Sequence, residues 1–433
     1  MSPSKVLLIK SGRLIDPESG RDETADLLIR SGKIASVGKR IRKPEGAEVL
    51  DAKGLVVTPG LVDMHVHLRE PGREDEETIL SGAQAAAAGG FTAVACMPNT
   101  EPAIDTQETV RFVRQQAEGV PARVYPIGAV TRGRRGEELT EMADLVAAGA
   151  VAVSDDGCEV ADAGMLRRAL EYASMFDIPI ISHCEDPALS GQGVMHEGYL
   201  STVLGLRGIP VVSEETMVAR DIRLAEFAGA RLHIAHVSSA GSVELIRMAK
   251  ARGIRVTAEA TPHHFTLTDE AVRGYDTDTK VNPPLRTAVD RQAIRDGLAD
   301  GTIDCVASDH APHSSEEKEL EYDAAPFGMI GLETSLGLVL TELVAAGVLS
   351  LSDVIARMST HPRRILGLEG GILRKGAPAD LTLIDPQARW TVDRKTFRSR
   401  SRNTPFDGWE LTGRAEATIV GGRIVFQRSR DEK

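Results

Sequence analysis

The sequence predicts an α/β fold: a (β/α)8 barrel of the TIM type with a small β-sandwich built from both chain ends. The first observation is an alternation of two textures along residues 61–361. Short β-branched runs that end in polar residues give way to longer stretches with helical spacing. Eight such strand–helix units match the barrel, whose parallel strands are buried on both faces. The second observation is that residues 5–58 and 370–433 alternate and turn like short antiparallel strands.

The expected barrel strands share an apolar body and a polar carboxyl end. They are residues 61–68, 91–98, 122–130, 150–157, 178–185, 231–239, 254–262 and 303–313. Several of the helical stretches between them end in a glycine that can serve as a C-cap, at Gly89, Gly149, Gly229 and Gly253. A doubly wound open sheet is the alternative, but it normally carries a glycine-rich phosphate loop after its first strand, and the sequence has none there.

The two chain ends share a plan that places them in one unit. The segments ADLLIRSGKIASVG and EATIVGGRIVF both have a strand, a glycine turn and a second strand. We therefore expect residues 1–58 and 366–433 to form the β-sandwich domain, and residues 59–365 to form the catalytic barrel.

Composition narrows the classes of partner. The chain has 433 residues and a formal net charge of -12, with its basic residues spread along the sequence. Nucleic-acid binding needs a concentrated basic face, so nucleic acid is not expected. No apolar run approaches the roughly 20 residues that span a bilayer, so no membrane is expected either. The four cysteines are scattered without a CxxC pair, which favours buried thiols in the reducing cytoplasm, at Cys96, Cys158, Cys184 and Cys305.

The strongest local signal is the pair His65 and His67 at the end of the first barrel strand. Side chains two residues apart in a strand point to the same face, so both imidazoles converge. Imidazole is a preferred zinc ligand, and the pair forms half of a tetrahedral site. Asp63 shares this face, where it could fix an imidazole tautomer or simply be a buried, hydrogen-bonded carboxylate. We favour the first.

Other strands end in the same kind of residue, which strengthens the prediction of a metal site. The carboxyl ends of barrel strands are where the catalytic groups of this fold lie. The residues at these ends are Asp155 and Asp156, His183, His236 and Asp309.

The pleat of a strand separates ligands from neighbours. His233 and His236 face opposite sides, and His236 is the better ligand because it lies nearer the loop. Asp155 and Asp156 likewise cannot both face a metal. The remaining histidines are assigned to packing or loop positions: His196, His263, His264 and His361.

Seven segments then carry a family resemblance: PGLVDMHVHLREPG, CMPNTEP, SDDG, HCED, HVSS, KVNPPLR and SDHAPH. In order and spacing they resemble the amidohydrolase superfamily and, more narrowly, the bacterial dihydroorotases of pyrimidine biosynthesis. The HxHxREPG, MPNT, NPPLR and DHAPH set is specific to the dihydroorotase, allantoinase and hydantoinase neighbourhood. MPNT together with KVNPPLR favours dihydroorotase.

The resemblance implies one or two Zn²⁺ ions per chain. One zinc would be held by His65, His67 and Asp309, and a second by His183 and His236. Many members of the superfamily bridge two metals with a carboxylated lysine, but residues 150–157 contain no lysine. The resemblance implies that Asp156, just before Gly157, is the bridge, as in a dihydroorotase subgroup that uses aspartate.

The resemblance also implies the reaction and the substrate contacts. The expected activity is the reversible cyclisation of N-carbamoyl-L-aspartate to L-dihydroorotate, with Asp309 moving the proton. The substrate carboxylate would be held by Arg69, Asn99 and His313, since a guanidinium fork and an amide suit an anion. The remaining substrate contacts would come from His67, Asn282, Phe327 and Gly328.

Two alternatives remain open. An allantoinase or dihydropyrimidinase acts on cyclic amides that lack the ring carboxylate, and so has no need of Arg69 and Asn99. A catalytically inactive homologue could serve as an assembly partner, although it has no reason to keep every ligand. We expect a homodimer, and leave association with aspartate transcarbamoylase open. Residues 314–325 are either a mobile lid or a plain solvated loop.

Overall fold

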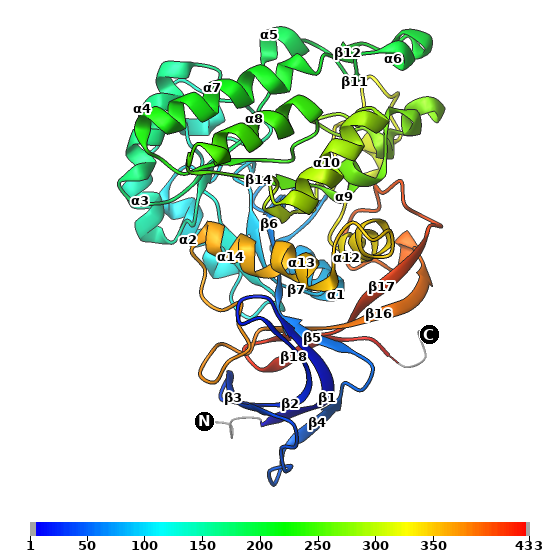
Figure 1. The fold of residues 1–433 in the computed structure, drawn as a ribbon. Helices are drawn as coiled ribbons and strands as arrows, with labels where there is room; N and C mark the ends of the chain where they lie inside the picture. The colour runs from blue at the N-terminus through cyan, green and yellow to red at the C-terminus, as the bar shows by residue number, and fades with distance from the viewer. Residues whose placement is uncertain (1–5, 430–433) are drawn as a thin grey trace.

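A barrel of parallel strands forms the centre of the computed structural model, which describes residues 6–429 (Figure 1). Its strands are β6 (Leu61–Val66), β7 (Phe91–Cys96), β8 (Arg123–Pro126), β9 (Val153–Ser154), β10 (Ile180–Ser182), β13 (Leu232–Ile234), β14 (Val256–Ala260) and β15 (Cys305–Val306). Strands β6, β7 and β8 pair in one run, and strands β9, β10, β13, β14 and β15 pair in another. Parallel bridges from Gly128 to Val153 and from Val66 to His310 join the two runs into a closed ring.

Helices follow the barrel strands and cover their outer faces (Figure 1). The longer ones are α1 (Ile79–Gly89), α2 (Gln107–Gln116), α3 (Met142–Ala148), α4 (Ala163–Ser174), α7 (Val212–Ala228), α8 (Ala240–Ala251) and α10 (Ala288–Asp300). After β15 come α12 (Ser335–Val339), α13 (Leu351–Ile355) and α14 (His361–Leu366). The loops carry the short elements α5 (Pro187–Ser190), β11 (Met195–His196), α6 (Tyr199–Leu204), β12 (Gly208–Ile209), α9 (Pro262–Thr266) and α11 (Ser315–Lys318).

Two of the predicted helix C-caps are correct and two are displaced by one residue. Gly149 and Gly229 cap α3 and α7 in the left-handed conformation. Helix α1 instead ends at Gly89 and is capped by Gly90, with φ 94°. Gly89 is needed for a different reason, because a Cβ there would collide with the carbonyl oxygen of Leu332. Helix α8 is capped by Arg252, and Gly253 follows it.

Two apolar layers hold the barrel together. Side chains between strands and helices form the larger core, and a second cluster that includes Met64, Ile127 and Ile181 fills the barrel interior. Burial raises the pKa of the Cys96 thiol to about 12. Cys184 and Cys305 are buried as well, whereas Cys158 is only half-buried, contrary to the expectation for it. No helix within residues 6–429 is both long and apolar enough to cross a membrane.

Both chain ends contribute to one eight-stranded sheet beside the barrel. Its strands are β1 (Leu7–Asp16), β2 (Arg21–Arg30), β3 (Lys33–Gly38), β4 (Glu48–Asp51), β5 (Val56–Pro59), β16 (Leu381–Thr391), β17 (Glu410–Val420) and β18 (Arg423–Gln427). Antiparallel pairing of β5 with β16 joins the two ends, with Val57 opposite Leu383. The sheet packs around an apolar core of its own, which we call the core of the β-domain. The connection between β16 and β17 leaves this domain and runs along the barrel (Figure 1).

Candidate active site

Three predicted ligands meet where the first and last barrel strands end. His65 and His67 project from the end of β6, and Asp309 follows β15. The Nε2 atoms of His65 and His67 lie 3.5 and 3.1 Å from Oδ1 of Asp309. All three side chains are buried. The pleat of β6 therefore brings both imidazoles to one carboxylate.

Asp156 lies between two pairs of imidazoles. Its Oδ2 atom is 3.4 Å from His65 Nε2 and 3.5 Å from His67 Nε2. Its Oδ1 atom is 3.4 Å from His236 Nε2 and 3.7 Å from His183 Nδ1. Each oxygen thus faces a different pair, which is the arrangement a bridging carboxylate needs.

Asp155 points the other way. Its carboxylate accepts hydrogen bonds from the backbone N–H groups of Val130 and Thr131 and from the Thr131 hydroxyl. These bonds fix the loop after β8 to the end of β9. Asp155 is a structural carboxylate, and Asp156 alone of the two faces the cluster.

The second imidazole pair comes from β10 and β13. His183 Nδ1 and His236 Nε2 lie 3.0 Å apart. The backbone of His236 has φ 31° and that of Asp309 has φ 48°, a left-handed conformation that is uncommon for residues other than glycine. Such strain persists where the surrounding structure imposes it, and it clusters at functional sites.

The cluster fits a divalent cation. Two groups of potential ligand atoms lie together, His65, His67 and Asp309 in one and His65, Asp156 and His236 in the other. The buried atoms His65 Nε2 and Asp156 Oδ1 have no hydrogen-bond partner, so both are free to bind a cation. Although burial opposes it, the imidazoles around Asp156 hold the pKa of that carboxyl well below its usual range. Imidazole and carboxylate are the donor set of catalytic metal sites.

A buried carboxylate orients His65 from behind. Oε1 of Glu259, on β14, lies 2.6 Å from His65 Nδ1. Its Oε2 lies 3.2 Å from His233 Nε2, and His233 Nδ1 is 2.9 Å from the Thr257 hydroxyl. Burial would raise the pKa of Glu259, but His65 and His233 lower it to about 2. The ionised Glu259 keeps the proton of His65 on Nδ1 and leaves Nε2 directed at the cluster.

A cavity of about 360 Å³ opens beside the cluster. The residues expected to contact substrate all line it: His67, Arg69, Asn99, Asn282, His313, Phe327 and Gly328. Asn99 also orients the imidazole of His67, since the Asn99 Oδ1 is 2.7 Å from His67 Nδ1. The cavity therefore joins the cluster to the guanidinium of Arg69.

Arg69 and His313 lie together at one end of this cavity. Arg69 Nη2 is 3.3 Å from His313 Nε2, and its Nε donates to the carbonyl oxygen of Pro312. His313 Nε2 is also 2.8 Å from the carbonyl oxygen of Phe327. At the other end, Asn282 Nδ2 is 3.5 Å from His183 Nε2. The cavity thus has two separate parts, the end lined by Arg69 and His313 and the part beside the cluster.

Relatives of known name share both the fold and the length of this chain. A family model described as dihydro-orotase-like matches residues 54–242. The dihydroorotase of Pelotomaculum thermopropionicum is 61% identical over 421 residues, which cover 97% of this chain and 98% of that protein. The dihydroorotase of Syntrophotalea carbinolica is 56% identical, over 98% and 99% of the two chains. This chain belongs to the dihydroorotase family.

Solved structures support the same fold. L-Hydantoinase (dihydropyrimidinase) from Arthrobacter aurescens superimposes with a TM-score of 0.89 at 28% identity, over 98% of this chain and 96% of that one. D-Hydantoinase (dihydropyrimidinase) from a Thermus species gives 0.85 at 28% identity, over 97% and 95%. The predictions of the fold class, of the family and of an enzyme acting on cyclic amides are confirmed. The His and Asp clusters are those of a metal-dependent enzyme.

The role favoured for Asp63 is wrong in this dihydroorotase-family chain. Within residues 6–429 its carboxylate is hydrogen-bonded to no imidazole; it accepts hydrogen bonds from the backbone N–H groups of His65 and Ser308. Burial raises its pKa to about 7. Asp63 ties β6 to β15. The carboxylate that fixes an imidazole tautomer is Glu259 on β14, which lies 194 residues after His65 and which the HxH motif does not indicate.

The remaining histidines are mostly satisfied elsewhere. His264 bonds to the Thr261 hydroxyl and the carbonyl oxygen of Pro283, His196 to Arg286, and His361 to the carbonyl oxygen of Asp304. The exception is His263, which is buried with Nε2 unpartnered. Burial and the neighbouring His264 lower its pKa well below the usual value, so it is a neutral imidazole.

Arg134 lines the cavity and was missed by sequence reasoning. Its Nη2 donates to the carbonyl oxygen of Asp156 at 2.8 Å, and its backbone has φ 57°. The residue lies in the loop after the third barrel strand, on the face where active sites of this fold form. That position was the one available signal, and it does not separate Arg134 from the neighbouring arginines, Arg132 and Arg135.

Residues 314–325 are anchored by two buried lysines. Lys280 Nζ donates to the carbonyl oxygens of Tyr322, Asp323 and Ala325, at 2.6 to 3.0 Å. Lys318 Nζ donates to those of Pro326 and Gly328, both at 3.0 Å. These bonds tie the segment to the cavity rim at Phe327.

Proposed function

We propose that this chain is a zinc-dependent dihydroorotase that interconverts N-carbamoyl-L-aspartate and L-dihydroorotate in the synthesis of pyrimidines. The observation that carries the proposal is the pairing of a His and Asp metal cluster with the Arg69 end in one cavity of about 360 Å³. A cyclic amide with a carboxylate on its ring needs both. The names of relatives at 56 and 61% identity support the same substrate.

We propose that His65, His67 and Asp309 hold one zinc, that His183 and His236 hold a second, and that Asp156 bridges them. The unpartnered His65 Nε2 and Asp156 Oδ1 support this assignment. When bound, zinc supplies Lewis acidity for the ring carbonyl and lowers the pKa of the attacking water. Glu259 keeps His65 in the tautomer that can ligate.

Asp309 is the proposed proton carrier. Burial opposes ionisation, but His65 and His67 hold the pKa of Asp309 well below its usual range, so it is a carboxylate at neutral pH. In the hydrolytic direction it takes a proton from water as the oxygen attacks the ring carbonyl carbon. It then gives that proton to the ring nitrogen as the carbon–nitrogen bond breaks. Ring closure runs through the same steps in reverse.

The proposed substrate-binding residues orient the ring. Arg69, Asn99 and His313, which all line the cavity, hold the substrate carboxylate. Asn282 contacts the far side of the ring through an amide whose Oδ1 has no partner. The backbone at Phe327 and Gly328 closes the rim. Holding the ring at two ends places its amide carbonyl at the cluster, which lowers the entropic part of the barrier.

The rival proposal is a hydantoinase or dihydropyrimidinase, since those are the names of the similar solved structures. Arg69 weighs against it, because a buried guanidinium facing the cavity has no partner on a substrate without a carboxylate. The identity of 28% to those structures is also far below the 61% to a dihydroorotase.

The test is turnover of L-dihydroorotate against hydantoin and dihydrouracil, with the metal content of the same sample measured. We expect dihydroorotate turnover that a chelator abolishes and that Asp309→Asn lowers about 10²- to 10⁴-fold, the usual effect of a general acid–base group. Faster turnover of hydantoin would favour the rival, and stoichiometric metal with no turnover of any substrate would favour an inactive homologue.

Several expectations from the sequence stay predictions alongside this one. They are the boundaries of the barrel at residues 59–365 and of the β-domain at 1–58 and 366–433, a homodimer, and a cytoplasmic location. Association with aspartate transcarbamoylase stays open. The four free cysteines are in keeping with a reducing compartment.

A further inference from the structure

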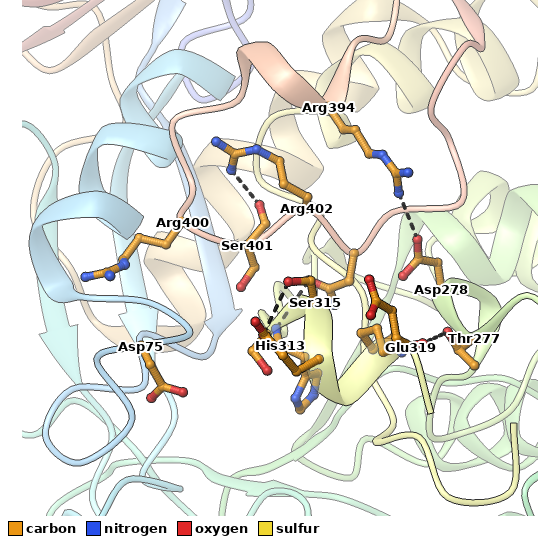
Figure 2. Close-up of a pocket in the computed structure, with 14 residues that line it drawn as sticks. Asp75, Thr277, Asp278, His313, Ser315, Glu319, Arg394, Arg400, Ser401 and Arg402 are labelled. Carbon is orange, nitrogen blue, oxygen red and sulfur yellow. Dashed lines mark hydrogen bonds and ion pairs between the residues drawn. The ribbon is translucent and has the colours of Figure 1, made fainter. Parts of the chain in front are cut away.

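Residues 399–403 of the connection between β16 and β17 reach the face of the barrel that holds the cavity. We call these five residues the strap. In Figure 2 the chain that carries Arg400, Ser401 and Arg402 passes over His313 and Ser315. A second cavity, of about 430 Å³, lies between the strap and α11. His313 lines both this cavity and the candidate active site. The β-domain thus extends to the substrate end of the barrel.

Asn403 of the strap crosslinks the loop after β15. Its Oδ1 accepts from the backbone N–H of His313 at 3.2 Å, and its Nδ2 donates to the carbonyl oxygens of Ala311 and Gly328, at 3.0 and 3.1 Å. The N–H of Ile330 donates to the Asn403 carbonyl oxygen. One buried amide therefore fixes both sides of the loop that presents His313 and Gly328 to the cavity.

The strap also fixes the loop after β6. The Ser401 hydroxyl donates to the carbonyl oxygen of Glu76 at 2.8 Å. The Ser399 hydroxyl and the Arg400 N–H donate to the carboxylate of Glu77, at 2.5 and 3.2 Å. The same five residues thereby hold loops from opposite ends of the barrel sequence.

Glu76 connects these loops at the site itself. Its side chain is about 1% exposed. Oε2 lies 3.1 Å from Arg69 Nε, and Oε1 lies 3.0 Å from His313 Nδ1. One carboxylate therefore sits behind both groups that face the carboxylate end of the cavity, and it fixes the direction of the guanidinium and the imidazole.

We propose that Glu76 and the strap residue Asn403 are positioning residues that set the geometry of Arg69 and His313 and so determine affinity for the substrate carboxylate. This rests on the proposed function of Arg69 and His313. Within residues 6–429, no hydrogen bond of the strap reaches the six candidate metal ligands. The proposal therefore separates substrate affinity, set in part by the β-domain, from metal binding, set within the barrel.

The physical reason is preorganisation. A free arginine side chain samples many rotamers, and fixing it only when substrate arrives costs binding free energy. A guanidinium binds a carboxylate well only when its planar fork is aimed at both oxygens. Two loops held by one strap and one buried carboxylate are already in that arrangement before substrate binds.

The experiment compares Asn403→Ala with Thr404→Val. Thr404 is the next residue and is also buried, but its hydroxyl accepts from the N–H of Phe406 and makes no hydrogen bond to the cavity loops within residues 6–429. The probes are orotate, which carries the ring carboxylate, and uracil, which lacks it, with Kd measured by calorimetry on metal-loaded protein. We expect Asn403→Ala to weaken orotate binding about tenfold and leave uracil binding and metal content unchanged, and Thr404→Val to change none of them.

A double-mutant cycle locates the effect. If the strap acts through Arg69, then Asn403→Ala should weaken orotate binding much less in an Arg69→Met background than in the wild type. Ser401→Ala removes a single hydrogen bond and serves if Asn403→Ala does not fold; it should raise the orotate Kd by a few fold. The KM for dihydroorotate should follow the orotate Kd, while kcat changes less.

The outcomes separate this proposal from the proposed function. Wild-type protein that neither binds orotate nor turns over dihydroorotate contradicts the function itself. The wild-type protein could do both while Asn403→Ala and Thr404→Val give equal orotate Kd. That result would contradict the proposed positioning role of the strap and leave the proposed function intact. Equal losses for orotate and uracil, or lost metal, would show that Asn403 only supports the fold.

Discussion

The metal cluster and the carboxylate end of the cavity are built in different ways. Of the six candidate ligands, His65 lies on β6 and the other five lie one to three residues after the end of a barrel strand. The carboxylate that orients His65 is itself on a barrel strand, β14. Arg69 and His313 lie on loops, and the groups that hold them are Glu76 on one loop and Asn403 from the β-domain.

This difference assigns separate tasks to separate parts of the chain. Strand ends are rigid, which suits ligands whose distances a metal ion restricts closely. Loops can change without disturbing the barrel, which suits a group that decides which cyclic amide is accepted. The comparison predicts that substitutions near the strand ends change metal affinity, and that substitutions behind the loops change substrate affinity only.

The largest effect is expected for Glu259→Gln. Loss of the charge behind His65 removes the preference for the proton on Nδ1 and weakens the ligand. We expect metal affinity to fall about 10- to 100-fold, which a competition titration with a chromophoric chelator measures. Asp63→Asn is the matched control, because Asp63 is as deeply buried but is hydrogen-bonded to the N–H of His65 and to Ser308, and to no imidazole within residues 6–429. It should lower the melting temperature with little change in metal affinity; the reverse ranking would contradict the assignment of Glu259.

A smaller and more specific effect is expected for Arg69→Lys. Lysine keeps the positive charge but loses the planar fork and the Nε–H that faces Glu76. The KM for dihydroorotate should rise about tenfold, with metal content unchanged. Steady-state kinetics at fixed metal loading measures this. If the metal is lost instead, the two regions are not independent and the comparison fails.

The strand-end residues could be predicted because they depend on local rules. A β-branched run with a polar end indicates where a barrel strand stops, and the period of two puts His65 and His67 on one face. The same logic left Asp155 and Asp156 undecided. The structure separates them because the Thr131 loop, which no local pattern connects to β9, captures Asp155.

The supporting residues could not be predicted, because each contact joins segments far apart in the chain. Glu259 meets His65 across 194 residues, and Asn403 meets His313 across 90. Asp63 was misassigned for the same reason: sequence neighbours of a ligand are visible in the sequence, whereas the residue that orients it is found only through the closed barrel. The loop position of Arg134 was visible, but nothing in the sequence distinguished it from adjacent arginines.

The smallest effect is expected at the edge of the carboxylate end, where Arg73 Nη2 lies 2.6 Å from Glu317 and 2.9 Å from Glu76. Glu317 is on α11, so this pair ties residues 314–325 to the loop after β6. Partial burial opposes it, but hydrogen bonds with Glu76 and Arg73 lower the pKa of Glu317 to about 2. Because the pair is partly exposed, it should contribute only about 0.2 to 1 kcal/mol to the free energy of unfolding.

The lowered pKa of Glu317 determines how its contribution to the free energy of unfolding changes with pH. A carboxylate whose pKa is lowered by folding stabilises the protein above its unfolded pKa, about 4.3, and loses that contribution as the pH falls through its folded pKa of about 2. Glu317→Gln should therefore lower the melting temperature by about 2 °C or less, with a constant difference from pH 8 to pH 5 that narrows below about pH 4. Scanning calorimetry of both proteins across this range measures it. A difference that instead widens on acidification would mean that Glu317 is held in its protonated form, sharing a proton with Glu76, and that the loop after β6 is bound to α11 by a neutral contact.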